Sequence, residues 1–271
     1  MDKNPLVSVI IVTYRTNLDY IFQAIDSVKR QSYKNIEIII ISDEPSKDAN
    51  KFFLKLAKQD ITIIYKKNEK KTSVAIARNQ WILLSKWKYI AMLDDDDIRN
   101  DKNKLLKQVK FLENNVDYGF CWADKMIEID LKWNITNLYK IKLSYDDIKK
   151  HLLQRNQFVQ SSILIRKESL CVSGIYDASY YTEDYELWCR IWKYYKFCNL
   201  DSSVKYRIVP NSLSHKNESI VKWGALKVCR KYRKYYPNWL KAIIMRLVWL
   251  LPPKYITFLS KLKQWLIKLF K

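Results

Sequence analysis

Regularly alternating strand and helix patterns constrain the fold of this chain more than any other feature of its sequence. The apolar runs Val7–Val12, Ile36–Ile41 and Tyr89–Leu93 are typical of buried strands, and Ile61–Tyr65 forms a fourth, shorter run. Apolar residues between these runs recur at helical spacing. This order predicts an α/β fold with a mainly parallel sheet and helices on both faces. The helices expected from this spacing cover residues 18–28, 52–57 and 73–85.

The second half of the chain shows less regular patterns. We expect helices over Asn103–Asn114 and Asp184–Tyr195, and strands over Tyr118–Ala123 and Phe158–Ile165. No internal repeat or low-complexity linker divides the sequence. The 271 residues are enough for one sizeable domain, or for one domain with an appendage.

The rarity of glycine excludes one large class of nucleotide site. Only three glycines occur, far apart, so neither a glycine-rich phosphate loop nor a dinucleotide fingerprint can be assembled.

The five cysteines are scattered and only two histidines accompany them, which disfavours a zinc site. Reduced thiols in the cytosol are the simplest interpretation. No charged-then-apolar leader precedes the first strand, so we expect the substrate to be met on the cytoplasmic side.

A formal charge of +21 calls for an anionic partner, and most of it lies near the C-terminus. Residues 216–271 contain 14 Lys or Arg and one acid, a net +13. Here Asn238–Leu251 is apolar but interrupted by two basic residues, and it falls short of the ~20 residues of a spanning helix. Lys254–Lys271 is expected to form a cationic amphipathic helix that suits the surface of an anionic bilayer. An ordinary terminal helix packed on its own domain is the alternative.

Four consecutive aspartates, Asp94 to Asp97, directly follow the predicted strand Tyr89–Leu93. Like charges this close repel, so water or a cation must compensate them, and a solvated acidic turn and a metal site stay equally open. In an extended chain Asp94 and Asp96 point the same way and can converge on one ion. Oxygen ligands favour magnesium, manganese or calcium, and a calcium loop fails because its glycine and distal glutamate are missing.

Polar residues also end the first two strands, at Thr13-Tyr14-Arg15 and at Ser42-Asp43. Ligands of open α/β sheets gather at the carboxyl ends of the strands, where these clusters and the aspartates lie. A metal held by few protein ligands typically also binds substrate phosphates. Transfer of a sugar from a nucleotide diphosphate is one reaction with this need, because the departing diphosphate gains charge that a divalent ion neutralises.

Several blocks spread over most of the chain resemble glycosyltransferase family 2, and their order and spacing make the combination specific. The resemblance implies a GT-A fold, with a Rossmann-like nucleotide-binding half and a mixed-sheet acceptor half, and usually an inverting transfer. Leu93–Asp97 resembles the DxD region of the family, and Ala77-Arg78-Asn79 its short Ala-Arg-Asn segment. The other blocks that carry the resemblance are Val7–Tyr14, Asp26–Tyr33, Ile36–Ile38, Ser161–Arg166 and Glu183–Trp188.

The resemblance also implies which residues surround the donor nucleotide. Asp43 would accept a hydrogen bond from the nucleobase, and Asp95 would lie near the ribose and diphosphate. Thr13, Tyr14 and Arg78 would complete this part of the site. The residues alone allow plainer roles, in which Asp43 is a turn former that bonds its own backbone, Arg78 a surface cation and Tyr14 core packing.

The remaining implied roles concern the metal and the acceptor. Asp96, helped by Asp94, would hold Mg²⁺ or Mn²⁺, and Asp184 would be the general base that removes the proton of the acceptor hydroxyl. A single displacement at the anomeric carbon needs one base and no second, nucleophilic carboxylate. Asp184 could instead cap the helix that it begins. Asp97 receives no role, and Val209 stands where the family commonly has a histidine, so a metal contact from that position is lost.

Together these inferences predict a metal-dependent, inverting hexosyl- or N-acetylhexosaminyl-transferase. Its donor is expected to be a UDP-sugar, and its acceptor a hydroxyl of a glycan or lipid-linked glycan in bacterial surface polysaccharide synthesis. We expect residues 1–215 to form the catalytic domain, with a nucleotide-sugar half at 1–117 and an acceptor half at 118–215. Residues 216–271 are expected to be a basic, amphipathic helical tail that holds a cytoplasmic protein peripherally on the inner face of the membrane.

Two other classes of function stay open. A nucleotidyltransferase or other phosphoryl-transfer enzyme could use the same aspartates, but the chain lacks a glycine-rich phosphate loop and this class leaves Glu183-Asp184 unexplained. A non-catalytic nucleic-acid-binding protein would explain the charge. Two features argue against this class: the acidic run at a strand end, and the concentration of positive charge in an apolar C-terminal tail.

Overall fold

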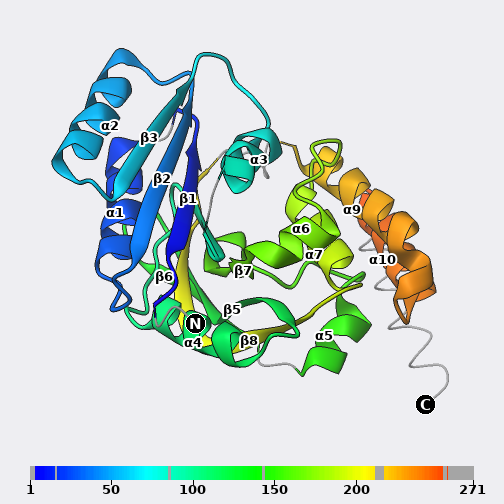
Figure 1. Cartoon of the computed structure of the whole chain (residues 1–271). Helices are drawn as coiled ribbons and strands as arrows, with labels where there is room; N and C mark the ends of the chain where they lie inside the picture. Colours follow the sequence, from blue (N-terminus) through cyan, green and yellow to red (C-terminus); the bar gives the residue numbers. More distant parts are fainter. Residues whose placement is uncertain are drawn as a thin grey trace.

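The computed structural model describes residues 4–15, 17–84, 87–141, 144–210, 217–252 and residue 255. Its backbone is built on one eight-stranded mixed sheet with helices on both faces (Figure 1). The predicted α/β fold with a mainly parallel first half is confirmed.

The sheet consists of a parallel half and an antiparallel extension. Strands β1 to β4 are all parallel and stand in the order β3-β2-β1-β4. The short strand β7 then pairs antiparallel with both β4 and β5, and β5 carries β6 antiparallel and β8 parallel along its length. The strands are β1 (Val7–Thr13), β2 (Ile36–Asp43), β3 (Ile63–Asn68), β4 (Tyr89–Asp94), β5 (Tyr118–Ile129), β6 (Ile135–Lys140), β7 (Leu164–Arg166) and β8 (Lys196–Arg207).

Helices cover the sheet in two layers, each with its own hydrophobic core. One cluster packs side chains of α1 (Leu18–Lys29), α2 (Lys47–Gln59) and α4 (Lys104–Asn114) against one face. The other face meets α3 (Val74–Leu84), α5 (Tyr145–His151), α6 (Lys167–Ser173) and α7 (Glu183–Ile191). The two clusters divide successive strand residues between them, since side chains alternate along a strand: Ile10 belongs to one and Ile11 to the other.

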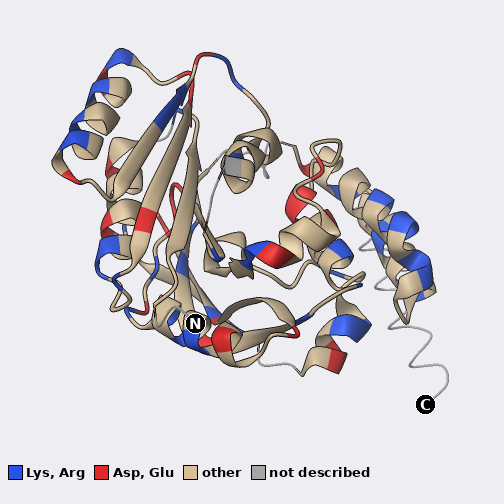
Figure 2. Ribbon diagram, viewed as in Figure 1, with Lys and Arg blue, Asp and Glu red and all other residues tan. Residues whose placement is uncertain are grey.

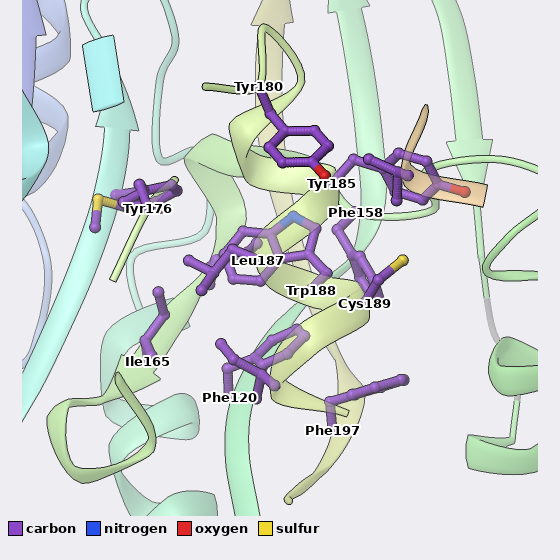
Figure 3. Close-up of a cluster of buried hydrophobic side chains, with 14 of the residues drawn as sticks. Phe120, Phe158, Ile165, Tyr176, Tyr180, Tyr185, Leu187, Trp188, Cys189 and Phe197 are labelled. Carbon is purple, nitrogen blue, oxygen red and sulfur yellow. The ribbon is translucent and has the colours of Figure 1, made fainter. Parts of the chain in front are cut away.

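Aromatic rings dominate the core under the second half of the sheet. Phe120 of β5 contacts Trp188 of α7 at a centroid distance of 4.9 Å, and Phe158 meets Trp122 edge-on at 4.4 Å. Figure 3 shows Phe120, Phe158 and Phe197 gathered around Leu187 and Trp188. Such pairs contribute about 0.5–1.5 kcal/mol each beyond the area that they bury. This core fixes α7, which carries Glu183 and Asp184, against the sheet.

Two expected elements of the second half differ from the structure. The predicted strand over Phe158–Ile165 is wrong for most of its length, because Gln160–Ser162 forms a turn of 3-10 helix and only Leu164–Arg166 is a strand. Ser161 of that turn bonds to Asp94 and Asp97, as described below. The helix expected over Asp184–Tyr195 is α7, which ends at Ile191.

The chain after the acceptor half forms two more helices. α9 (Glu218–Tyr232) and α10 (Trp239–Leu250) are joined through a 3-10 turn at Arg233–Tyr235. Val228 and Tyr232 share a hydrophobic cluster with α7. This part of the predicted tail is therefore packed on the domain.

The amphipathic helix expected over Lys254–Lys271 lies outside the described residues, apart from Tyr255. Within the part of the chain that the structure describes, no helix has the length and apolar character needed to cross a membrane.

Candidate active site

The carboxyl ends of β1, β2 and β4 lie side by side and bring the three polar clusters to one edge of the sheet. Thr13 is in register with Ser42, and Val12 with Asp94. Thr13 is buried. The chain turns sharply after β1 and β2, where Arg15 and Glu44 have positive φ angles of 54° and 43°. A terminal nitrogen of Arg15 lies 3.6 Å from a carboxylate oxygen of Glu44.

Asp43 is held by the segment that leads from β3 into α3. Its Oδ1 accepts a hydrogen bond from the Asn68 side chain at 2.8 Å, and its Oδ2 accepts from the Thr72 amide at 2.7 Å and hydroxyl at 3.0 Å. Asp43 is therefore not a turn former that bonds its own turn. It pins a distant loop at the strand edge, and its carboxylate oxygens retain lone pairs for a further donor.

Two cations lie close to the Tyr14 ring at the same edge. The Lys71 ammonium stands 4.2 Å from the ring centroid and the Arg15 guanidinium 5.1 Å from it. The half-buried ring belongs to neither hydrophobic cluster. The plain core-packing interpretation of Tyr14 is thus not what the structure shows, and the surrounding positive charge suits an anionic ligand.

The four aspartates form a tight turn and not the extended chain that we expected. The amide of Asp97 donates to the carbonyl of Asp94 at 3.2 Å, so Asp95 and Asp96 occupy the two central positions. Burial, followed by repulsion from Asp95 and Asp94, raises the pKa of Asp96 to about 7. The turn, and not the alternation of a strand, brings these carboxylates together.

Asp97, to which the sequence assigned no role, anchors this turn. It is fully buried, and burial raises its pKa well above the usual value. Its Oδ2 accepts from the Ser161 hydroxyl at 2.5 Å and its Oδ1 accepts from the Arg207 amide at 3.0 Å. The Ser161 oxygen in turn accepts from the Asp94 amide at 3.0 Å. The 3-10 turn at Gln160–Ser162, where a strand was expected, thus bonds to both ends of the aspartate turn, Asp94 and Asp97.

Arg207, at the end of β8, clamps the same turn from the other side. Its Nε donates to the Asp96 carbonyl at 3.0 Å, and one terminal nitrogen donates to Gln23 of α1 at 2.7 Å. The guanidinium lies between the rings of Tyr20 and Trp133, 4.5 and 4.8 Å from their centroids. The sequence patterns did not single out Arg207, although it stands in a stretch, Tyr206 to Val209, that resembles the family.

Arg78 joins the aspartate turn to the acidic start of α7. One terminal nitrogen donates to Asp94 at 2.8 Å and the other to Glu183 at 3.0 Å, although the two acids are 89 residues apart. Burial opposes the charge of Arg78, but Asp94, Tyr176, Glu183 and Asp184 outweigh it and raise the pKa of the guanidinium. Arg78 is therefore a buried bridge between the two halves and not a surface cation.

Asp184 lies in the first turn of α7, beside this bridge. Its Oδ1 accepts from the amide of Tyr185 at 2.6 Å, and its Oδ2 accepts from the Asn156 side chain at 3.0 Å. Burial raises the pKa of Asp184, against these hydrogen bonds and the charge of Arg78. The helix begins at Glu183, so Asp184 is not its cap residue. A raised pKa makes its carboxylate a better proton acceptor.

Glu186, two residues further along α7, belongs to the core and not to the site. It is fully buried and accepts from Arg190 at 2.7 Å, Lys231 at 2.8 Å and Tyr232 at 2.5 Å. Burial acts to raise its pKa, but these donors outweigh burial and lower it. Glu186 thereby ties α7 to α9 and fixes the helix that presents Asp184.

The donor atoms at the aspartate turn fit a hard divalent cation. They are all oxygens, and the pKa of Asp96 is raised first by burial and then by repulsion from Asp95 and Asp94, which a cation would relieve. Among the described residues, no group of three or more His, Cys, Asp or Glu converges as a metal centre would require. A cation here would therefore depend on substrate oxygens for the rest of its coordination, as Mg²⁺ commonly does.

The five cysteines play no part at this edge of the sheet. All are free thiols, and Cys121, Cys189 and Cys229 are buried.

A mixed α/β sheet with its polar site at the parallel strand ends defines a protein of the GT-A fold. The structure of a mannosyltransferase from Pyrobaculum calidifontis, in complex with GDP-Man and Mn²⁺, superposes with a TM-score of 0.68 at 14% identity and covers 92% of this chain and 70% of that one. The model of Glycosyl transferase family 2 matches residues 8–171. The chain belongs to glycosyltransferase family 2.

Two relatives support the same assignment. An uncharacterized glycosyltransferase of Methanocaldococcus jannaschii is 33% identical over 247 residues, which cover 88% of this chain and 83% of that protein. The UDP-Glc:alpha-D-GlcNAc-diphosphoundecaprenol beta-1,3-glucosyltransferase WfaP of Escherichia coli is 33% identical over 188 residues, 69% of this chain and 70% of that protein. The suggested family resemblance is thus confirmed.

Proposed function

We propose that this glycosyltransferase is metal-dependent and inverting, and that it transfers a hexosyl or N-acetylhexosaminyl group from a UDP-sugar to a hydroxyl of a lipid-linked glycan. The observation that carries the proposal is the Arg78 bridge, which places the Asp94 end of the aspartate turn and the start of α7 around one buried guanidinium. A donor held at the turn and an acceptor held at α7 would meet there. The substrates named for WfaP, UDP-Glc and a diphosphoundecaprenol-linked GlcNAc, support this substrate class.

Different residues at the sheet edge would bind different parts of the donor. Asp43 would take a hydrogen bond from the nucleobase, Thr13 and Tyr14 would flank the nucleoside, and Asp95 would contact the ribose and diphosphate. Asp94 and Asp96 would hold Mg²⁺ or Mn²⁺. The cation, when bound, neutralises the charge that develops on the departing diphosphate. Arg78 would supply a second positive charge close to that group.

Asp184 would act as the base in a single displacement. Its carboxylate would accept the proton of the acceptor hydroxyl while the hydroxyl oxygen forms a bond to the anomeric carbon and the bond from that carbon to the diphosphate breaks. One attack from the opposite face inverts the anomeric configuration. Asn156 would orient the carboxylate, since it donates to Oδ2 at 3.0 Å. The raised pKa of Asp184 predicts that kcat/KM increases with pH on the acidic side.

A donor screen tests the proposal. Sugar nucleotides would be added to the protein with and without Mn²⁺, and the melting temperature measured. The correct donor is expected to raise the melting temperature only with the metal, because a ligand stabilises the folded state in proportion to the logarithm of its concentration over its Kd. That donor is then supplied with lipid-linked acceptors. Release of a nucleoside diphosphate supports glycosyl transfer, whereas release of pyrophosphate would point to the nucleotidyltransferase alternative.

The location of the enzyme is part of the proposal. A lipid-linked acceptor requires that the enzyme work at a membrane surface, and we place it on the cytoplasmic side, where sugar nucleotides are made. The basic C-terminal region of the chain supports this location through its charge, +13 over residues 216–271.

A further inference from the structure

The outer face of α10 is apolar along its whole length. Leu240, Ile244, Leu247 and Leu251 stand at spacings of four, three and four residues, which places them on one side of the helix. Their exposed fractions are 57%, 53%, 48% and 36%. A helix at the surface of a soluble domain normally shows the reverse arrangement, with its polar residues outward.

The one arginine of α10 points inward. Arg246 is only 8% exposed, and its guanidinium lies 5.4 Å from the ring centroid of Tyr185 and 5.3 Å from that of Trp249. The helix therefore packs Arg246 against the domain, leaves Lys241 exposed, and presents leucine and isoleucine to the outside. An exposed apolar stripe of this kind indicates that the outer face of α10 binds a partner and does not face water alone.

The helix α9, which packs against α10, carries basic side chains on its exposed side. Trp223, Lys227, Arg230 and Lys234 follow one another along the exposed side of α9 and its following turn. The first three line a surface hollow together with Leu226. Residues 217–252 contain eight basic residues and one acid, a net +7. Figure 2 shows this basic character on the paired helices α9 and α10, at the end of the molecule away from α1 and α2.

We propose that the paired helices α9 and α10 dock the enzyme on an anionic lipid bilayer, with the α10 stripe inserted among the acyl chains and the α9 cations on the headgroups. This inference rests on the proposed location and not on the proposed reaction. The charge decides the occupant, because a second copy of this face would bring +7 against +7. Exposed tryptophans, Trp223 at 60% and Trp239 at 41%, suit the interface of a bilayer.

Docking through these helices would also orient the active site. Glu186 of α7 accepts from Lys231 and Tyr232 of α9, and Tyr185 of α7 lies under Arg246 of α10. α7 is thus bound to both docking helices by buried contacts, and it carries Asp184 two residues before Glu186. The bilayer would thereby hold the acceptor side of the site in a fixed orientation to the surface from which a lipid-linked acceptor projects.

Vesicle flotation of the full chain tests the docking surface. The wild-type protein is expected to float with phosphatidylcholine vesicles that contain phosphatidylglycerol and to stay unbound with pure phosphatidylcholine. The triple variant Leu240→Ser, Ile244→Ser, Leu247→Ser should partition on the order of a hundredfold less, because it removes most of the inserted apolar area. The double variant Lys227→Ala, Arg230→Ala should lose about fivefold for each cation removed.

A matched control uses three exposed apolar residues outside α9 and α10, in the triple variant Leu54→Ser, Ile61→Ser, Val116→Ser. It should float like the wild type. Thermal unfolding and donor binding, measured without lipid, should be the same for all variants, so a failure of the proposed reaction would not be mistaken for a failure of docking. Wild-type flotation by the α10 variant would overturn the proposal, because residues 253–271 or another surface would then bind the lipid. A wild-type protein that dimerises through α10 and ignores anionic vesicles would overturn it as well.

Discussion

The backbone amide of Arg207 donates a hydrogen bond to the buried carboxylate of Asp97 at 3.0 Å, across 110 positions of the sequence. The same arginine donates from its side chain to the Asp96 carbonyl at 3.0 Å. Ser161 holds the turn from the opposite side. Two distant segments therefore hold the aspartate turn in one conformation, so its carboxylates are already in position when a ligand binds.

Replacement of Arg207 by lysine should weaken metal use more than folding. A lysine keeps the charge, but it lacks the planar fork that donates to Asp96 and Gln23 from two nitrogens and that stacks on aromatic rings. We expect the Mn²⁺ concentration for half-maximal transfer to rise roughly 10- to 100-fold, the usual effect of removing the support of a metal ligand. Arg30→Lys, which alters an exposed pair with Asp26, is the control. An unchanged metal dependence in Arg207→Lys would refute the supporting role.

Glu183 should impose a pH dependence on stability in the metal-free protein. Burial raises its pKa from 4.5 to about 7, so the folded state binds a proton more tightly than the unfolded state does. This group must then lower the stability of the wild type as pH rises from about 4.5 to 7. The variant Glu183→Gln lacks that loss, and its unfolding free energy relative to the wild type should increase over this range, by at most ~1.4 kcal/mol per pH unit.

Glu113 provides a control of opposite sign. Burial acts to raise its pKa, but hydrogen bonds from Lys88 and Tyr89 outweigh burial and lower the pKa below 4.5. The stability from Glu113 is complete above about pH 4.5 and is lost as the pH falls further. The difference between Glu113→Gln and the wild type should therefore be flat from pH 4.5 to 7. Chemical denaturation at several pH values measures both variants, and a flat Glu183→Gln difference would contradict the account.

Asp43→Asn should reduce donor affinity and loosen the loop after β3. The new amide group would face the donating amide of Thr72, which leaves a partly buried donor without an acceptor. The cost is about 1–3 kcal/mol. Asp60→Asn is a matched change, because Asp60 accepts from the amide and hydroxyl of Thr62 in a similar way. Calorimetric titration with the donor should show weaker binding for Asp43→Asn only; equal affinities in both variants would remove Asp43 from the site.

Gly119→Ala should destabilise the core beneath α6. A Cβ there would stand 2.8 Å from the Cβ of Tyr195 and 3.1 Å from that of Ser169, and both atoms move only with their backbone. We expect a loss of about 1–3 kcal/mol. Gly224→Ala on α9 would meet the rotatable Thr182 hydroxyl at 3.0 Å and gain helix propensity, so its effect should be small. Unfolding curves compare the two, and equal effects would show that the clash at Gly119 is relieved.

Local patterns in the sequence predict the parallel half of the fold and the residues at its edge. Strands β1 to β4 are apolar runs separated by helical periodicity, so each is visible without tertiary information. β6 was not found, because all of its residues are exposed. β8 was not found because polar residues interrupt it at Asn199, Asp201 and Lys205. A strand at the end of a sheet, or one that is half covered, lacks the continuous apolar signal of a buried strand.

The candidate site divides in the same way. Asp43, Asp94 and Asp184 end strands or begin helices, and the family resemblance names them. The partners that hold them do not follow from any short pattern: Thr72 reaches Asp43 across 29 residues and Asn156 reaches Asp184 across 28. The Arg78 bridge to Glu183 spans 105. Such contacts follow from how the chain packs, so the supporting residues became visible only in the structure.

Asp184→Asn gives the most direct measurement of the central claim. With the donor from the screen, Mn²⁺ and a lipid-linked acceptor, the release of nucleoside diphosphate would be followed for the wild type and the variant. Donor affinity, measured separately, should be unchanged, while transfer should fall about 10²- to 10⁴-fold because the acceptor hydroxyl loses its base. Asp177→Asn, an exposed aspartate that accepts from the Ser179 amide, should transfer at the wild-type rate. Wild-type turnover by Asp184→Asn would contradict the account.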